Sequence, residues 1–116
     1  MRIPSDAVID DAKLTDYLLV RRPWDDKSGY LRRAGFDVEN WTDLRRAIRR
    51  LADAVDVVED GANEYGVFYR VEGPLAGPRA TLPVVCIWMR RAIDNRFHFV
   101  TLKPVRERSD DDSAAL

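Results

Sequence analysis

The sequence changes its hydrophobic period near residue 55, and this change is the feature that most constrains the fold. Before it, apolar residues recur every three or four positions, at Trp41, Leu44, Ile48, Leu51 and Val55. Such spacing is typical of a single apolar stripe on an α-helix. After it, short runs of β-branched and aromatic residues alternate with segments rich in glycine and proline, as strands and turns do. Helices followed by strands predict an α+β fold.

The expected elements follow from these patterns and from their end signals. Asp10 can cap a first helix, Pro23 disfavours its continuation, and Gly35 can close a second helix in the left-handed conformation. Helices are therefore expected over residues 10–20, 25–36 and 40–55, and strands over 55–60, 65–71, 82–91 and 96–103. Residues 61–66 are expected to form a turn and 72–80 a loop. We expect two to three N-terminal helices packed on one face of a roughly four-stranded antiparallel sheet, whose other face is partly open.

Length and composition predict one small domain. A chain of 116 residues with 46% hydrophobic and 34% charged residues can bury one core. We expect a single domain over residues 1–106 and an acidic, disordered tail over 107–116. The longest apolar run, at 82–89, is too short to span a membrane, and the N-terminus does not resemble a signal peptide, so we expect a cytoplasmic protein without a membrane partner. Cys86, the single cysteine, is expected to be a buried thiol.

The charge of the chain is nearly balanced but unevenly distributed. The net charge of −1 does not indicate a nucleic-acid-binding protein. Residues 85–106, however, contain five basic side chains and one acidic side chain. One histidine and one cysteine give no metal site, and no phosphate-binding glycine loop or hydrolase motif is present, so we expect no metal and no cofactor.

His98, the single histidine, is the first candidate for chemistry. Metal-independent RNA cleavage needs a base near neutral pKa, a cation beside the phosphate and an acid for the leaving oxygen. If Phe97 and Phe99 point to the helices, alternation places His98 and Arg96 together on the open face. The alternative is that His98 is an exposed or hydrogen-bonded strand residue without a catalytic role.

Other candidates surround this strand. Strict alternation places Thr101 on the side of the phenylalanines, so a β-bulge would be needed to bring it beside His98. Arg90 and Arg91 end the preceding strand, and one of them must face the open side. Lys27 lies near an expected helix start, where the positive end of the helix dipole disfavours a cation. A lysine at this unfavourable position indicates a functional role.

Aromatic and basic residues could also bind RNA. Tyr65 and Tyr69 could stack bases and Arg70 could contact phosphate, although both tyrosines would serve equally well in packing. Four arginines, at positions 45, 46, 49 and 50, share one side of the longest expected helix. We interpret them first as a solvated face and secondly as a surface for nucleic acid or a partner. Trp41 and Trp88 are expected in the core.

Several segments resemble a family of small, uncharacterised bacterial domains. They are MRIP (1–4), AVID and KLTDYLL within 7–19, GF (35–36), YGVFYRVEGPLAGP (65–78), the Trp of CIW (86–88) and FVTLKP (99–104). Lys27 and Tyr30 match the family's lysine-containing segment, and Thr101 and Pro104 match its last strand, whereas the second basic residue after Lys27 is missing. Members of this family occur beside small antitoxin-like genes and at the ends of polymorphic toxins. The resemblance therefore implies a toxin context and a ribonuclease-like architecture of the barnase, colicin and RelE kind.

Two functional hypotheses follow. The first is a ribonuclease-like toxin that cuts an RNA substrate without a metal and is neutralised by a cognate antitoxin or immunity protein. The second is a non-enzymatic interaction module, such as an antitoxin, an immunity protein or an inactive toxin remnant. The acidic tail and the missing basic residue favour the second hypothesis, and the basic strand region favours the first.

Overall fold

Helices precede strands along the chain, as the change of period predicts. The computed structural model describes residues 1–21, 23 and 27–105. The elements are α1 (Asp11–Lys13), the π-helix η1 (Leu14–Leu18), α2 (Ser28–Arg33), the 3-10 helix η2 (Val38–Asn40), α3 (Trp41–Ala54), β1 (Val58–Asn63), β2 (Gly66–Ala76), β3 (Thr81–Arg91) and β4 (Phe97–Pro104). The α+β class is confirmed. The expected tail over 107–116 lies outside the described residues.

The first helix changes its winding after one turn. The Asp10 carboxylate accepts a hydrogen bond from the amide of Ala12, which caps α1. The amide of Leu19 then donates to the carbonyl of Leu14 at 3.0 Å, a bond that spans five residues and defines the π-helix. Leu14 and Leu18 are fully buried, so the wider turn keeps both leucines on the core side while Tyr17 lies beside them, half-buried.

Helix α3 begins after a capping box one turn upstream. The carboxylate of Asp37 accepts a hydrogen bond from the Asn40 amide, and the side-chain oxygen of Asn40 accepts one from the Asp37 amide. The helix then buries Leu44, Ile48 and Leu51, the stripe that the sequence predicts.

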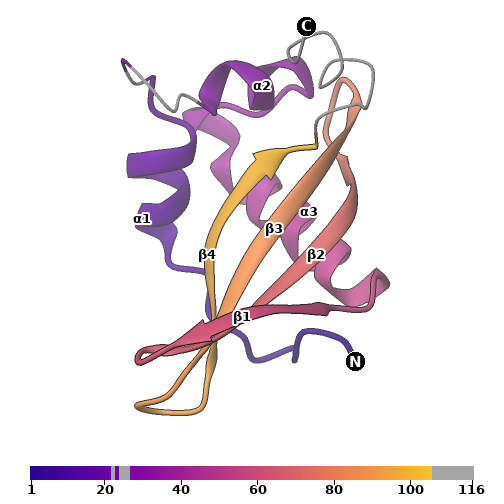
Figure 1. Ribbon diagram of the computed structural model, residues 1–116. Helices are drawn as coiled ribbons and strands as arrows, with labels where there is room; N and C mark the ends of the chain where they lie inside the picture. Colours follow the sequence, from indigo (N-terminus) through magenta and orange to yellow (C-terminus); the bar gives the residue numbers. More distant parts are fainter. Residues whose placement is uncertain (22, 24–26, 106–116) are drawn as a thin grey trace, which may run out of the picture.

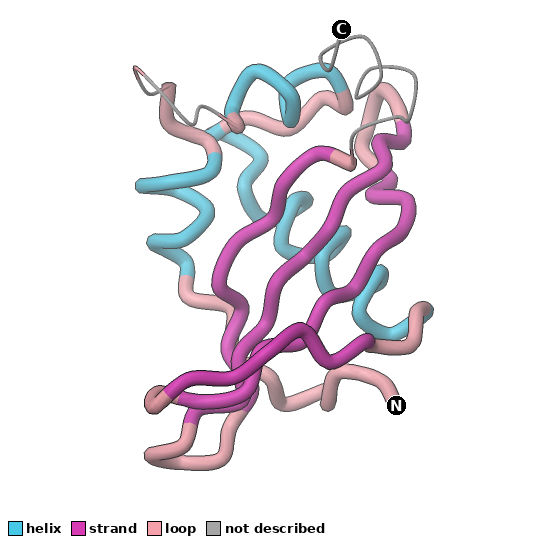
Figure 2. Tube along the Cα trace, in the orientation of Figure 1, coloured by secondary structure: helices cyan, strands magenta, loops and turns pink. Residues whose placement is uncertain are grey.

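The four strands form one antiparallel sheet in the order β1-β2-β3-β4 (Figure 2). The expected loop over 72–80 is wrong for residues 72–76, which continue β2. Pro74 has no amide hydrogen to donate to a neighbouring strand. It is tolerated there because β1 pairs with β2 only up to Arg70, so no residue of β1 lies opposite Pro74. The first strand also starts later than expected, at Val58, and residues 61–63 are strand residues rather than part of a turn.

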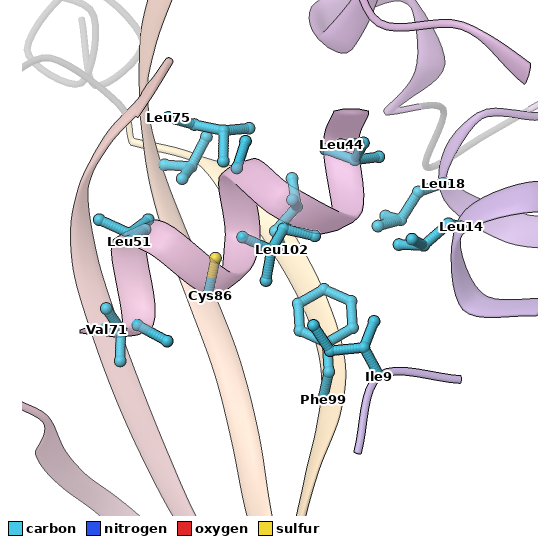
Figure 3. Close-up of a cluster of buried hydrophobic side chains, with 14 of the residues drawn as sticks. Ile9, Leu14, Leu18, Leu44, Leu51, Val71, Leu75, Cys86, Phe99 and Leu102 are labelled. Atoms are coloured by element: carbon cyan, nitrogen blue, oxygen red, sulfur yellow. The ribbon is translucent and has the colours of Figure 1, made fainter. Parts of the chain in front are cut away.

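The core lies between α3 and one face of the sheet. In Figure 1 helix α3 runs behind β2 and β3, and α1 lies beyond the edge formed by β4. Figure 3 shows Leu51 of α3 on the side of Val71 and Leu44 on the side of Leu18, in one cluster with Cys86 and Leu102 of the sheet. Cys86 and Trp88 are buried as expected, and Trp41 packs against the core while partly exposed. None of the helices in the described ranges is long and apolar enough to cross a membrane.

Candidate functional site

The face of the sheet opposite α3 carries several of the polar candidates, and we call it the uncovered face. It is turned to the viewer in Figure 1. The strand register places side chains in rows across it because directly paired residues project to the same side. One row pairs Phe68 with Met89 and Met89 with His98, and the next row pairs Arg70 with Ile87 and Ile87 with Thr101.

A β-bulge brings Thr101 to the face that carries His98. The pairing of β3 with β4 shifts between Ile87 and Trp88, so that Ile87 is opposite Thr101 while Trp88 is opposite Phe99. Val100 is the extra residue. Because Ile87 and Met89 are two residues apart on a regular strand, the rows of Thr101 and His98 lie about 7 Å apart. The bulge required for this arrangement is present in the structure.

His98 is half-buried beside a carboxylate. Its side chain is 22% exposed, and its Nε2 atom lies 3.6 Å from Oδ2 of Asp94. This separation is too long for a hydrogen bond, and the pair becomes an ion pair only when the imidazole is protonated. The backbone on either side is held by Val8, whose amide donates to the Phe97 carbonyl and whose carbonyl accepts from the Phe99 amide, both at 2.8 Å.

Asp94 was not predicted as a site residue. It lies in the turn between β3 and β4, where its Oδ1 atom accepts a hydrogen bond from the amide of Arg96 at 3.0 Å. That hydrogen bond lowers the pKa of the Asp94 carboxyl, and the nearby charges of Arg91 and His98 lower it further. The carboxylate therefore stays ionised beside His98. The sequence contained one indication of this pair: Asp94 lies four positions before His98, in the expected turn between the last two strands.

A second polar cluster lies at the outer edge of β4. The Nζ atom of Lys27 lies 2.9 Å from the hydroxyl of Tyr17 and 3.4 Å from the hydroxyl of Thr101. The ammonium also lies 5.1 Å from the centre of the Tyr17 ring. Tyr17 is not among the predicted site residues, because its spacing from Leu14 and Leu18 is that of the apolar side of a helix. Only the fold brings the π-helix, the start of α2 and β4 together.

The arginines divide between the two faces of the sheet. Arg70 and Arg91 are on the uncovered face, as their pairing with Ile87 and Gly66 shows. Arg90 pairs with Phe97 and so belongs to the face covered by α3. Arg96 is exposed and precedes β4, and its guanidinium lies 3.4 Å from the Asp6 carbonyl at the outer edge of the strand. The structure thus places His98 and Arg91 on one face. Arg96, which was expected beside His98, extends instead towards Asp6 at the outer edge of β4.

The two tyrosines of the β1–β2 hairpin have different environments. Tyr69 is 7% exposed and packs against Phe97 with ring centres 5.3 Å apart on the covered face, which removes it from contact with a ligand. Tyr65 is 67% exposed and lines an open hollow of about 520 Å³ together with Glu64, Met89, Arg91, Ala92 and Ile93. Met89 links this hollow to His98, its partner across β3 and β4.

The arginine face of α3 is largely occupied by structural contacts. Arg45 pairs with Asp11 at 2.6 Å and Arg46 with Asp43 at 3.0 Å, while Arg49 donates to the carbonyl of Ala7 at 2.8 Å. The contacts of Arg45 and Arg49 tie the helix to the N-terminal segment, whereas the Arg46–Asp43 pair lies within the helix. Over the described residues, no three histidine, cysteine or acidic side chains gather in a way that could hold a metal ion.

Comparisons with known proteins give a fold and a family. No curated protein matches the sequence significantly. A solved structure described as a contact-dependent growth inhibition toxin–immunity protein complex from Klebsiella pneumoniae 342 contains a chain with the same fold. The TM-score is 0.65 at 19% identity, and the match covers 85% of this chain and 100% of that chain. A family model described as a domain of unknown function, DUF6883, matches residues 4–106, and the chain therefore belongs to this family.

Proposed function

We propose that this domain is a ribonuclease-like toxin that cleaves RNA without a metal ion on the uncovered face of its sheet. The observation that carries the proposal is the bulge at Val100, since it aligns Thr101 and the attached Lys27 with His98. His98 shares this face with Thr101, and Lys27 and Tyr17 adjoin Thr101 at the edge of β4. Together they offer the base, the cation and the hydroxyl groups that phosphodiester cleavage requires.

In the proposed reaction, the ribose 2′-oxygen attacks the adjacent phosphorus. His98 accepts the proton of the 2′-hydroxyl, and the ionised Asp94 carboxylate stabilises the imidazolium that results. Lys27 and Thr101 bind the non-bridging oxygens, where negative charge increases in the transition state. The bond to the 5′-oxygen then breaks, and the hydroxyl of Tyr17, next to the Lys27 ammonium, supplies a proton to that oxygen. The products are a 2′,3′-cyclic phosphate and a 5′-hydroxyl.

The toxin context is supported by the likeness to the contact-dependent growth inhibition complex. That likeness is one of fold, and the complex contains both a toxin and an immunity protein. Within this context we propose a cognate immunity protein or antitoxin as the partner of the chain. Such a partner would block the uncovered face, which is where RNA would bind.

The decisive experiment is expression of the chain in bacteria together with RNA cleavage by the purified protein in EDTA. We expect growth arrest and cleavage for the natural sequence. His98→Ala should lower the cleavage rate by about 10²–10⁴-fold, the usual contribution of a general base. Arg50→Ala is the matched control for loss of a surface charge, since Arg50 is exposed on α3, and it should keep full activity. Intact RNA with folded protein, together with normal growth, would contradict the proposal.

A non-enzymatic interaction module is the second candidate. Tyr65 and Ile93 favour it, since two large apolar side chains that are 67% and 82% exposed are typical of a surface that binds protein. For such a module, a partner should co-purify at fixed stoichiometry, and His98→Ala should leave both growth and partner binding unchanged. RNA cleavage that His98→Ala abolishes would exclude this alternative.

A further inference from the structure

The hollow next to His98 has the chemistry of a nucleobase site. Its walls provide the aromatic ring of Tyr65 and the apolar side chains of Met89 and Ile93. Unpaired RNA bases are typically recognised by stacking on an aromatic ring and by hydrogen bonds to their edges. The Tyr65 ring is available for stacking because the residue is 67% exposed.

The backbone around the hollow is fixed by one hydrogen bond between the two hairpins that form it and by one within the β1–β2 hairpin. The Ala92 amide donates to the Tyr65 carbonyl at 2.8 Å, which joins the tip of the β1–β2 hairpin to the β3–β4 turn. The Tyr65 amide donates to the side chain of Asn63, also at 2.8 Å, and fixes the tip itself. The backbone of Tyr65 is thus positioned before any ligand arrives, and binding needs little ordering of the chain.

Two charged side chains, Glu64 and Arg91, also line the hollow. Glu64 offers only hydrogen-bond acceptors when ionised, and Arg91 offers only donors. Guanine presents ring and exocyclic N–H donors on one edge and the acceptors O6 and N7 on the adjacent edge. It is the base that can make two hydrogen bonds to a carboxylate and two to a guanidinium at once, whereas the other bases offer a carboxylate one donor group. An apolar protein side chain would use the apolar walls but would leave the Glu64 and Arg91 side chains unmatched.

We propose that this hollow binds one unstacked base of the RNA substrate, with a preference for guanine. The inference rests on the proposed ribonuclease function and specifies its substrate. Met89 lines the hollow and is directly opposite His98 in the sheet, so their Cβ atoms lie about 5 Å apart. A base in the hollow would therefore place its own ribose and phosphate beside His98.

The test uses nucleoside 3′-monophosphates, which contain no scissile bond, so that binding is measured apart from cleavage. NMR titration of the full chain with guanosine 3′-monophosphate should shift the signals of Tyr65, Met89 and Ile93, with weaker binding of the adenosine, cytidine and uridine analogues. Tyr65→Ala should weaken binding by about tenfold through loss of stacking, and Tyr65→Phe should retain it. Glu64→Gln should remove the preference for guanine, whereas Glu59→Gln, on the same hairpin, should keep it.

Each outcome separates this inference from the proposed function. RNA cleavage that is indifferent to Tyr65→Ala, with no nucleotide-dependent shifts at the hollow, would overturn the base site and leave the ribonuclease standing. Guanine-selective binding without RNA cleavage would support the base site and refute the ribonuclease. A hollow that takes no nucleotide but loses binding of a co-purified protein on Tyr65→Ala would overturn the inference in favour of a protein surface.

Discussion

At the scale of single residues, the Thr101 hydroxyl is one of the groups on which the proposed chemistry depends. Thr101 is half-buried, and its Oγ1 atom lies 3.4 Å from the Nζ atom of Lys27. We expect Thr101→Ser to keep the RNA cleavage rate near that of the natural sequence, because the hydroxyl remains. Thr101→Val has nearly the same shape but no hydroxyl, and should lower the rate by about tenfold to a hundredfold. Equal rates for the serine and valine variants, measured on the same RNA, would exclude a role for this oxygen.

Cys86 gives a second prediction at the residue scale. Desolvation by burial raises the pKa of its thiol from 9.0 to about 12. The thiol should therefore resist alkylation at pH 8 until urea unfolds the protein. Because the folded-state pKa is the higher one, the stability linked to this thiol is fully present below pH 9.0 and is lost as the pH rises towards about 12.

The pH dependence is checked by urea unfolding over that range. We expect the free energy of unfolding to fall less steeply with pH for Cys86→Ala than for the natural sequence, since the variant has no thiol to ionise. Parallel slopes for the two proteins, or fast alkylation without urea, would show that the thiol is accessible in the folded state.

At the scale of elements, the approach of α3 to β2 depends on Gly73. A Cβ atom at this position would lie 2.8 Å from Leu51 Cδ1 and 3.4 Å from Val55 Cγ2, both in or next to the helix. We expect Gly73→Ala to destabilise the fold by about 1–3 kcal/mol through overpacking. Gly29→Ala is the control, because a Cβ atom there meets only the end of Arg32 at 4.0 Å. Because Gly29 lies in α2, the Gly29→Ala substitution should raise the free energy of unfolding, measured in urea, by about 0.5–1 kcal/mol.

The elements also show what sequence patterns can and cannot locate. The helix over 41–54 was predicted within a residue at each end because its stripe has a strong 3.6-residue period. Residues 72–76 were expected in a loop because Gly73 and Pro74 disfavour strands on average. They form a strand because Pro74 has no β1 partner and Gly73 makes room for α3. Both reasons concern neighbours that are distant in sequence.

At the scale of the whole molecule, the N-terminal segment belongs to the same core as the sheet. Leu14 is fully buried and lies in one cluster with Leu44, Phe99 and Leu102 (Figure 3). We expect Leu14→Ala to lower the free energy of unfolding by about 2–5 kcal/mol. The unfolding midpoints followed by far-UV and by near-UV circular dichroism should fall by the same amount, because the domain unfolds in one transition. Val38→Ala is the control, since Val38 is 46% exposed and its loss should change stability by less than about 0.5 kcal/mol. Separate transitions in the two signals would mean that the N-terminal segment unfolds independently.

The sequence by itself determined the order of helices before strands, the apolar stripe of α3 and the identity of the buried residues Cys86 and Trp88. These follow from local periodicity, which each segment carries within itself. Only the tertiary structure decided that Thr101 shares a face with His98, that Lys27 meets Tyr17, and that Arg96 extends towards Asp6. A bulge shifts the register by one residue, and the partners in these contacts are up to 90 positions apart. Local pattern constrains each element, but the contacts between distant elements are set by how the elements pack.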